Sequence, residues 1–385
     1  RDYYASRGLG DVYKRQEEND MKKNKGITLV ALVVTIVVLL ILAGVSINLV
    51  LGNNGIIAKA KDAETKSAEA SQNDLKGMNG LVSEMEGALA GNGSTGNGNT
   101  GSGNNFVTKN TEVTYPGGNV WIPEGFRISK DSASTVQNGV VIEDKDGNQF
   151  VWVPVATIAD YKRTWYTGDA SFSSYLEALP EDEKTSVKTY KGFYIGRYEA
   201  GDKESTVAKT LRSSNDVTKT VTIKANQAPY NYVTRTQAVS LAEGFATKQG
   251  YKAKTKLVSS YAWDTTIAFI EKTVNNYGSS SSQGNYSDTS VTYKDITDES
   301  KPEKTKAENS PLLVATGQTT PVCNIYDMGG NVWERTTESY SNTYYPYARR
   351  GGGYNSSFAN YPAGGRDGGS DVAFDLLGFR LTLFM

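Results

Sequence analysis

Hydrophobic residues are distributed very unevenly along the chain. Residues 26–58 contain no charged side chain, and residues 27–51 within them are almost entirely apolar. Three lysines, Lys22, Lys23 and Lys25, come directly before this segment. About 20 apolar residues span a bilayer as a helix, and lysines before such a span favour a cytoplasmic N-terminus. The pattern therefore predicts a transmembrane helix at residues 27–51, with the remainder of the chain outside the cytoplasm.

The polar pattern after this helix predicts three further parts. Residues 52–90 mix Ala, Lys, Glu and Leu and favour a helical stalk, and residues 91–105 contain mainly Gly, Asn, Ser and Thr and are typical of a flexible linker. Short apolar segments and turn residues then alternate through residues 106–385, which predicts a globular domain. Residues 1–20 have neither a starting Met nor apolar periodicity, so we treat them as a non-native leader.

Within the domain, local patterns predict short strands and one long polar excursion. Residues 138–155 are typical of two strands joined by a hairpin turn at Asp146 and Gly147. The segment at residues 279–310 is long and polar, and we expect it to form a surface insertion.

The C-terminal part has an unusual residue alphabet. Residues 339–384 contain no Lys, Glu, Gln, Met or Trp, although Lys and Glu are common elsewhere. Codons that are randomised at their first two positions and keep a pyrimidine at the third encode every residue type except these five. Adenine-directed mutagenesis of Asn codons by a diversity-generating retroelement would leave this alphabet. We therefore expect a variable region at residues 339–378.

Three motifs in the same part resemble the formylglycine-generating-enzyme (sulfatase-modifying-factor) family. They are YDMGGNVWE at residues 326–334, RGG at 350–352 and GFR at 378–380. Upstream, residues 192–201 resemble the entry strand of that family, residues 229–245 resemble its first helix, and residues 257–270 resemble a further segment. The resemblance runs from about Trp121 to the end. It implies an α+β domain with the C-type-lectin-like fold, short strands and many loops. It also implies that Trp333, Gly351, Gly352, Phe379 and Arg380 belong to a constant scaffold.

One departure from the family concerns its chemistry. Active members use a cysteine pair after the Arg-Gly-Gly element, together with copper, to oxidise a substrate cysteine. This chain has a single cysteine, Cys323, which precedes that element, and it has no His. We expect Cys323 to be a small buried residue, and we expect neither catalysis nor bound copper.

The variable region is instead rich in residues that favour recognition. Tyr offers rigid amphipathic area, and Ser, Asn and Gly offer adaptable hydrogen bonds. We expect a binding surface for a protein or glycan on another cell or on phage, formed by the following residues: Tyr340, Asn342, Tyr344, Tyr345, Tyr347, Tyr354, Asn355, Ser356, Phe358, Asn360, Tyr361, Asp367, Asp371 and Phe374.

The resemblance also implies a structural calcium ion near the Asn-Val-Trp-Glu turn. Asn331 and Glu334 match the positions whose side chains bind it, and oxygen ligands suit a hard cation. The alternative is that both side chains hydrogen-bond the turn without an ion. Arg335 stands where many members have Trp, which departs from the family pattern.

The N-terminal segment resembles a prepilin signal. The basic leader at residues 21–26 ends in Gly26, and Ile27 follows directly. Cleavage between Gly26 and Ile27 by a prepilin peptidase would leave a pilin-like helix that other pilins could contact. Pilins usually carry Glu at the fifth mature position, where this chain has Ala31, which suits a minor or merely anchored subunit. The alternative is an uncleaved single-span anchor.

Composition narrows the functional classes. The net charge of −1 and the isoelectric point near 5.9 argue against a nucleic-acid partner. We expect a ligand-binding protein of the adhesin or receptor kind, displayed on a bacterial cell surface. The alternatives are a minor pseudopilin with a structural head and, more weakly, a sulfatase-modifying enzyme.

Overall fold

The computed structural model describes residue 34 and residues 105–166, 172–280, 282–297 and 303–385. The chain divides into two compact units, residues 1–97 and 98–385, and apart from Val34 the described residues all lie in the second. Within the described residues, no helix is long and apolar enough to cross a membrane. The expected membrane helix (Val34 apart), stalk, most of the linker, and the processing site at Gly26 and Ile27 lie outside the described residues and stay predictions.

A six-stranded antiparallel sheet carries most of the hydrophobic core. Its order is β11-β18-β7-β5-β4-β3, so the last strand of the chain lies between β11 and β7. The strands are β3 (Arg127–Ile128), β4 (Val141–Glu143), β5 (Gln149–Pro154), β7 (Gly192–Gly196), β11 (Lys254–Leu257) and β18 (Leu381–Phe384). The predicted hairpin turn at Asp146 and Gly147 is confirmed: it joins β4 to β5, and Gly147 adopts a φ of +81°.

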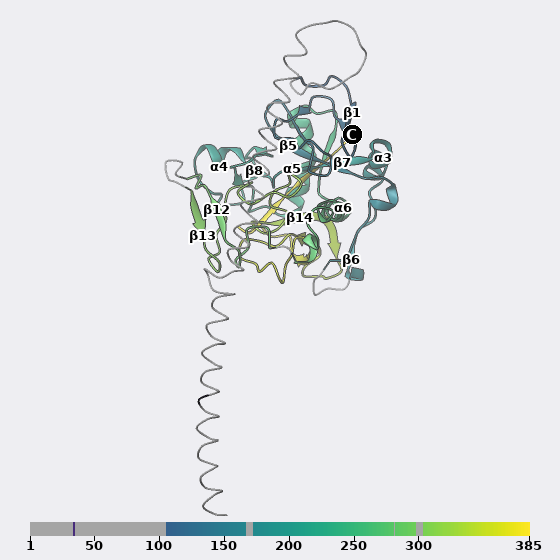
Figure 1. The fold of residues 1–385 in the computed structure, drawn as a ribbon. Coiled ribbons are helices and arrows are strands. Elements are labelled where there is room, and N and C mark those ends of the chain that lie inside the picture. The colour runs from purple at the N-terminus through teal and green to yellow at the C-terminus, as the bar shows by residue number, and fades with distance from the viewer. Residues whose placement is uncertain (1–33, 35–104, 167–171, 281, 298–302) are drawn as a thin grey trace, which may run out of the picture. The chain divides into compact units, whose positions relative to one another are not determined.

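Alternate residues of this sheet face two different hydrophobic clusters. Phe150 and Trp152 of β5 pack in a cluster with helix α5 (Arg235–Gln249), whereas Val151 and Val153 pack in a cluster with helix α6 (Ser260–Glu271). This is the two-residue side-chain period of a strand whose two faces are both covered. The sheet is therefore a buried layer between two helices (Figure 1).

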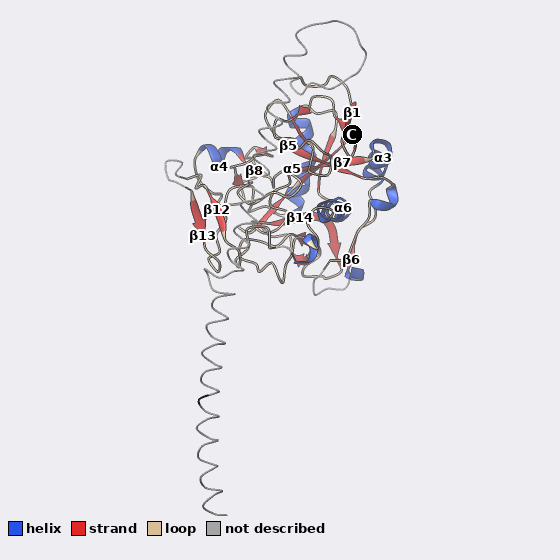
Figure 2. Cartoon of the chain, viewed as in Figure 1, coloured by secondary structure: helices blue, strands red, loops and turns tan. Residues whose placement is uncertain are grey.

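The remaining elements are short, and irregular loops connect them (Figure 2). The helices are α3 (Glu181–Tyr190), α4 (Lys203–Val207) and α7 (Tyr277–Ser280), with 3₁₀ turns η1 (Ile158–Asp160) and η2 (Phe172–Ser174). The small sheets are β1 (Thr111–Tyr115) with β2 (Gly118–Ile122), β10 (Ala228–Pro229) with β8 (Gly201–Asp202) and β9 (Val221–Thr222), and β12 (Val291–Tyr293) with β13 (Lys304–Lys306).

A second large sheet carries the predicted variable region. It runs β16-β15-β14-β17, and β6 pairs with the far end of β14. Its strands are β6 (Tyr175–Leu176), β14 (Trp333–Tyr340), β15 (Tyr347–Arg350), β16 (Arg366–Gly369) and β17 (Leu377–Phe379). The loops between these strands hold most of the predicted contact residues.

The prediction that residues 279–310 form a surface insertion is wrong for their first part. The hairpin β12–β13 does lie at the side of the domain (Figure 1), but Asn285 and Tyr286 are fully buried. The Tyr286 hydroxyl donates to the carbonyl of Gly351 at 2.9 Å, and the Asn285 amide donates to Oδ1 of Asn331 at 2.9 Å. The polarity of the segment concealed these two residues, because an amide N–H group and a phenol hydroxyl can be buried once they donate hydrogen bonds.

Candidate functional site

A cavity of about 460 Å³ opens at the β14–β15–β16 part of the second sheet. Its walls contain these residues: Tyr175, Tyr340, Asn342, Tyr345, Arg349, Asn360, Tyr361, Arg366, Asp367 and Gly368. The predicted contact residues among them are Tyr340, Asn342, Tyr345, Asn360, Tyr361 and Asp367. The structure thus brings together residues from three separate stretches of the predicted variable region.

Four wall residues were not among the sequence predictions. Gly368 lies beside Asp367, and Arg349 and Arg366 lie inside the predicted variable region, but arginines in a Tyr- and Gly-rich segment carried no signal of a cavity. Tyr175 comes from β6, far upstream, and reaches the site only because β6 pairs with β14. No sequence pattern links β6 to β14.

Two exposed tyrosines lie in one turn, and one of them, Tyr345, lines the cavity. Tyr344 and Tyr345 are 82% and 53% exposed, and they sit in the turn between β14 and β15. Oδ1 of Asn342 accepts hydrogen bonds from the backbone N–H groups of both tyrosines, at 2.9 and 3.1 Å. This side chain therefore shapes the turn that presents the two rings to solvent.

Deeper aromatic residues are tied to the scaffold. Tyr340 stacks on Tyr175, with ring centroids 4.6 Å apart, and Tyr361 packs edge-to-face against Trp333 at 5.0 Å. Trp333 itself is only 3% exposed, as expected for a core residue. Tyr340 and Tyr361 consequently have a packing role as well as a place in the wall.

The other predicted contact residues do not line the cavity, and several have structural partners. Ser356 is buried, Phe358 packs edge-to-face on Tyr286, and the Tyr354 hydroxyl donates to Asp375 at 2.8 Å. The ring of Tyr347 lies 4.9 Å from the guanidinium of Arg235. These four residues are thus held by structural contacts away from the cavity, and their role in binding stays a prediction.

Three members of that set remain on exposed loops. Phe374 is 54% exposed, and Asn355 and Asp371 are also exposed. Asp371 has a structural duty, because its carboxylate accepts from the backbone N–H of Arg235 and from the hydroxyl of Thr236 at the start of α5, at 2.5 and 2.7 Å. A carboxylate in the first turn of a helix compensates its unpaired N–H groups and dipole.

The floor of the cavity is a buried ionic network. Glu338 of β14 accepts from Arg366 at 2.9 Å and from Arg163 at 2.6 Å, and it lies 3.5 Å from Arg350. Asp264 of α6 accepts from both Arg350 and Arg366. The side chains of Arg350, Asp264 and Glu338 are fully buried.

Burial and neighbouring charges shift the pKa values of the two arginines in opposite directions. Burial alone would lower the pKa of Arg366, but attraction to Asp264 and Glu338 outweighs it and raises that pKa. Burial lowers the pKa of Arg350, and the neighbouring charge of Arg366 adds to this effect. Breaking such a network leaves an unpaired buried charge, so the floor should stay fixed while the rim changes.

The turn after β15 supports the expected scaffold role of Gly351 and Gly352. Their φ angles are +85° and +74°, which most side chains adopt only at a cost in energy. A Cβ atom on Gly352 would also lie 2.6 Å from the carbonyl oxygen of Tyr361. This turn therefore requires glycine, whatever occupies the loops around it.

The residues proposed for calcium are engaged by protein donors. Both carboxylate oxygens of Glu334 accept from Arg380, at 2.7 to 3.0 Å. Oδ1 of Asn331 accepts from Asn285 and from the backbone of Val314, and its Nδ2 donates to Glu199. Among the described residues, no group of three or more His, Cys, Asp or Glu side chains could hold a metal ion. These two side chains do not fit a calcium cage, and calcium binding stays a prediction of the resemblance alone.

The lone thiol is poorly suited to reaction. Cys323 is 7% exposed, and its Sγ lies 3.4 Å from the Thr273 hydroxyl. Burial raises the pKa of the Cys323 thiol, which disfavours the nucleophilic thiolate. The expectation of a small buried residue is confirmed.

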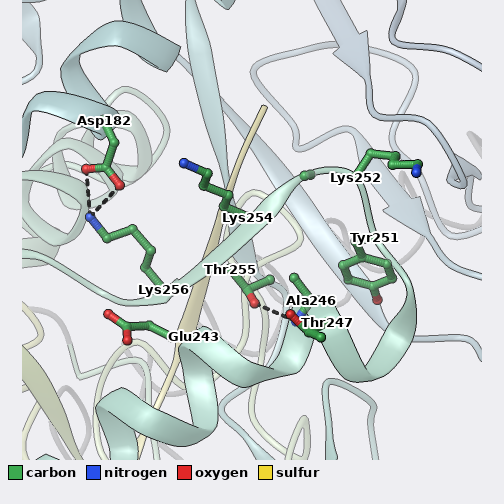
Figure 3. Close-up of a pocket in the computed structure, with 10 residues that line it drawn as sticks. Asp182, Glu243, Ala246, Thr247, Tyr251, Lys252, Lys254, Thr255 and Lys256 are labelled. Carbon is green, nitrogen blue, oxygen red and sulfur yellow. Dashed lines mark hydrogen bonds and ion pairs between the residues drawn. The ribbon is translucent and has the colours of Figure 1, made fainter.

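A second cavity, of about 350 Å³, lies between β11 and α5. Figure 3 shows the Lys256 ammonium pointing toward the Asp182 carboxylate, and the backbone N–H of Ala246 donates to the hydroxyl of Thr255. Lys252 and Lys254 also line it, and none of the predicted contact residues does.

Comparison with known proteins assigns the family. Residues 94–383 match the family model described as "Sulfatase-modifying factor enzyme 1-like domain". The chain belongs to this family. The expected α+β architecture with short strands is confirmed at that level. No curated protein matches the chain.

Three solved structures show limited similarity. "Structure of PvdO from Pseudomonas aeruginosa" has 16% identity and a TM-score of 0.37, covering 64% of this chain and 98% of that one. "Treponema denticola variable protein 1" has 14% identity and a TM-score of 0.37, covering 62% and 96%. "Crystal Structure of CarF" has 14% identity and a TM-score of 0.31, covering 51% and 87%.

Proposed function

We propose that the protein is a surface-displayed ligand-binding protein whose C-terminal loops are diversified. The ligand would be a protein or glycan on another cell or on phage. The cavity of the second sheet would receive part of that ligand, with Tyr345 in its wall and Tyr344 in the same turn.

The observation that supports this most is the arrangement of the wall residues. All but one of the wall residues, Tyr175, come from the region with the restricted alphabet, and Arg366 in that wall belongs to the buried ionic network of the floor. The volume of about 460 Å³ is in the usual range for small-ligand sites. Recognition residues commonly lie on loops above a rigid scaffold, because such loops can change without unfolding the protein.

A binding screen with matched variants tests the proposal. The full-length protein would be screened against a glycan array and a panel of surface proteins from co-resident bacteria and phage. For any bound probe, Tyr345→Ser should weaken binding at least about tenfold, since aromatic anchors dominate interface energetics. Lys254→Ser, in the cavity of Figure 3, should change it little. Binding that depends on Lys254 and ignores Tyr345 would refute the proposed surface.

We further propose that the domain does not carry out the cysteine oxidation of active relatives. The chain has no His and only one cysteine, and Cys323 is buried with its thiol pKa raised. The test is incubation of the purified protein with copper and a cysteine-containing sulfatase peptide. Conversion of that cysteine to formylglycine would overturn this proposal.

A further inference from the structure

We propose that Arg349 is an oriented carboxylate-binding group in the cavity wall and that residue 367 decides whether a ligand can use it. With Asp367 present, the guanidinium is neutralised internally. With an uncharged residue there, the cavity would bind a carboxylate carried on a ring. This inference rests on the proposed function, because it assigns a ligand chemistry to the same cavity.

The ion pair lies at the cavity surface. Arg349 of β15 and Asp367 of β16 are directly opposed in the strand register. Nε and Nη2 of Arg349 both donate to Oδ2 of Asp367, at 2.9 and 2.5 Å. The two side chains are 24% and 30% exposed, and both line the cavity. A ligand carboxylate could therefore occupy the place of the Asp367 carboxylate.

The orientation of Arg349 does not depend on Asp367 alone. Its guanidinium carbon lies 4.6 Å from the centroid of the Trp333 ring, and Trp333 is almost fully buried. A cation over an aromatic face is attracted by the ring quadrupole. The guanidinium fork matches the geometry of a carboxylate, so removing Asp367 would leave a preorganised receptor.

A second guanidinium increases the positive potential of this face. Arg335 of β14 is directly opposite Arg349, and Gly369 lies beside both side chains. Arg335 is 1% exposed, and it donates to the backbone carbonyls of Ser370 and Val372. These hydrogen-bond partners are uncharged. Burial lowers the pKa of Arg335, and attraction to the Asp371 carboxylate opposes this effect. Loss of Asp367 would therefore leave Arg349 and Arg335 with Asp371 as the remaining neighbouring carboxylate.

The restricted set of residue types makes position 367 effective in setting the charge of the cavity wall. Asp367 lies in the predicted variable region, and residues 339–384 contain no Glu and no Lys. Within that alphabet, Asp is the sole acidic residue, so most replacements at 367 remove the negative charge. Diversification at this position would therefore switch the cavity between a neutral and a cationic wall.

The surrounding tyrosines favour a ring next to the carboxylate. Tyr340, Tyr345 and Tyr361 line the same cavity as Arg349, and aromatic faces pack well against planar rings and against the C–H face of sugars. Two pairs of probes test this, and the members of each pair share a ring and differ in the charged carboxylate: glucuronate with glucose, and benzoate with benzamide. A gain in the sugar pair would indicate an acidic glycan, and a gain in the benzoate pair would indicate an aromatic acid.

The experiment uses the full-length protein labelled with 5-fluorotryptophan. The ¹⁹F signal of Trp333, assigned by its loss in Trp333→Phe, reports on the ring beneath Arg349. Asp367→Asn and Asp367→Ser should each bind the charged probe of at least one pair about tenfold or more tightly than the unsubstituted protein does. They should not gain affinity for the neutral probe of that pair.

Two control variants define the outcome. Asp367→Glu keeps the charge and should show no gain, and Arg349→Gln combined with Asp367→Asn should lose the gain. The inference is overturned if both neutral variants, shown to be folded by their melting temperatures, gain nothing, or if the gain survives without Arg349. The proposed function would still stand in that case if Tyr345→Ser weakened binding of the array probe as described above.

Discussion

At the scale of single residues, two neighbouring arginines have opposite environments. Arg350 is fully buried among Asp264 and Glu338, whereas Arg349 shares a half-exposed ion pair with Asp367. Arg350→Ala should lower the free energy of unfolding by about 3–5 kcal/mol, because it leaves two buried carboxylates short of a partner. Arg349→Ala should lower it by about 1 kcal/mol or less, because exposed pairs contribute little. Urea denaturation of both variants is the measurement, and equal losses would contradict this account of the floor.

Glu199 provides a second test at this scale. It is fully buried, and burial together with Asp327 and Glu334 raises its pKa well above the ordinary range. A raised folded-state pKa means that this carboxyl stabilises the fold at low pH, and that the contribution is lost as pH rises above about 4.3, the value in the unfolded chain. Glu199→Gln should therefore stabilise the protein by at least about 1 kcal/mol more at pH 8 than at pH 5.

The control for Glu199→Gln is Glu308→Gln, which changes an exposed carboxyl. It should leave the dependence of stability on pH as it is in the unsubstituted protein. Thermal unfolding measured between pH 5 and pH 8 gives both results. Equal behaviour of the two variants would show that Glu199 is not held protonated by its surroundings.

Residue-scale predictions from the sequence succeeded where local chemistry sufficed. The burial of Trp333 and Cys323, and the need for glycine at 351 and 352, followed from residue type and motif. The ionic floor could not be predicted, because Asp264 lies 86 positions before Arg350 and reaches it only through tertiary packing. A charged residue in isolation gives no sign of a buried partner.

At the scale of elements, the β14–β15 turn should separate binding from folding. Tyr344 and Tyr345 are largely exposed, whereas Tyr340 stacks on Tyr175 in β6. Replacing both exposed tyrosines by Ser should move the melting temperature by no more than about 2 °C, since surface changes are usually worth less than about 0.5 kcal/mol. Tyr340→Ser should destabilise the domain by about 2–4 kcal/mol, because it removes a large packed ring. Calorimetry measures both melting temperatures. If the double replacement unfolds the domain, the two rings belong to the hydrophobic core.

Element positions were predictable where a pattern was strong. The segment at 229–245 was expected to contain a helix, which begins at Arg235 and ends at Gln249, and the strand at β7 falls within the segment at 192–201. The pairing of β6 with β14 was not predicted, because a two-residue strand has no periodicity to detect. That pairing is also why Tyr175 was missed as a wall residue.

At the scale of the whole molecule, the chain is expected to hold its domain outside the cell on a processed N-terminal helix. Lys22, Lys23 and Lys25 precede the apolar residues 27–51, and Gly26 precedes Ile27. Protease added to intact cells should release the domain. Mass spectrometry of the mature protein should find Ile27 at its N-terminus. A mature N-terminal peptide that still carries Met21 would contradict cleavage and favour the uncleaved single-span anchor. Full protection of the domain, when the cell envelope is permeable to the protease, would contradict surface display.

The central claim is that the C-terminal loops are diversified above a constant floor, and sequencing of this gene across its source population tests it most directly. We predict substitutions that are confined to residues 339–378. They should be concentrated at codons derived from Asn codons, and at exposed or cavity positions such as Tyr344, Tyr345 and Asp367. Glu338, Arg350, Gly351, Gly352 and Arg380, which are buried, should not vary. An invariant C-terminus, or substitutions spread evenly along the chain, would contradict the account.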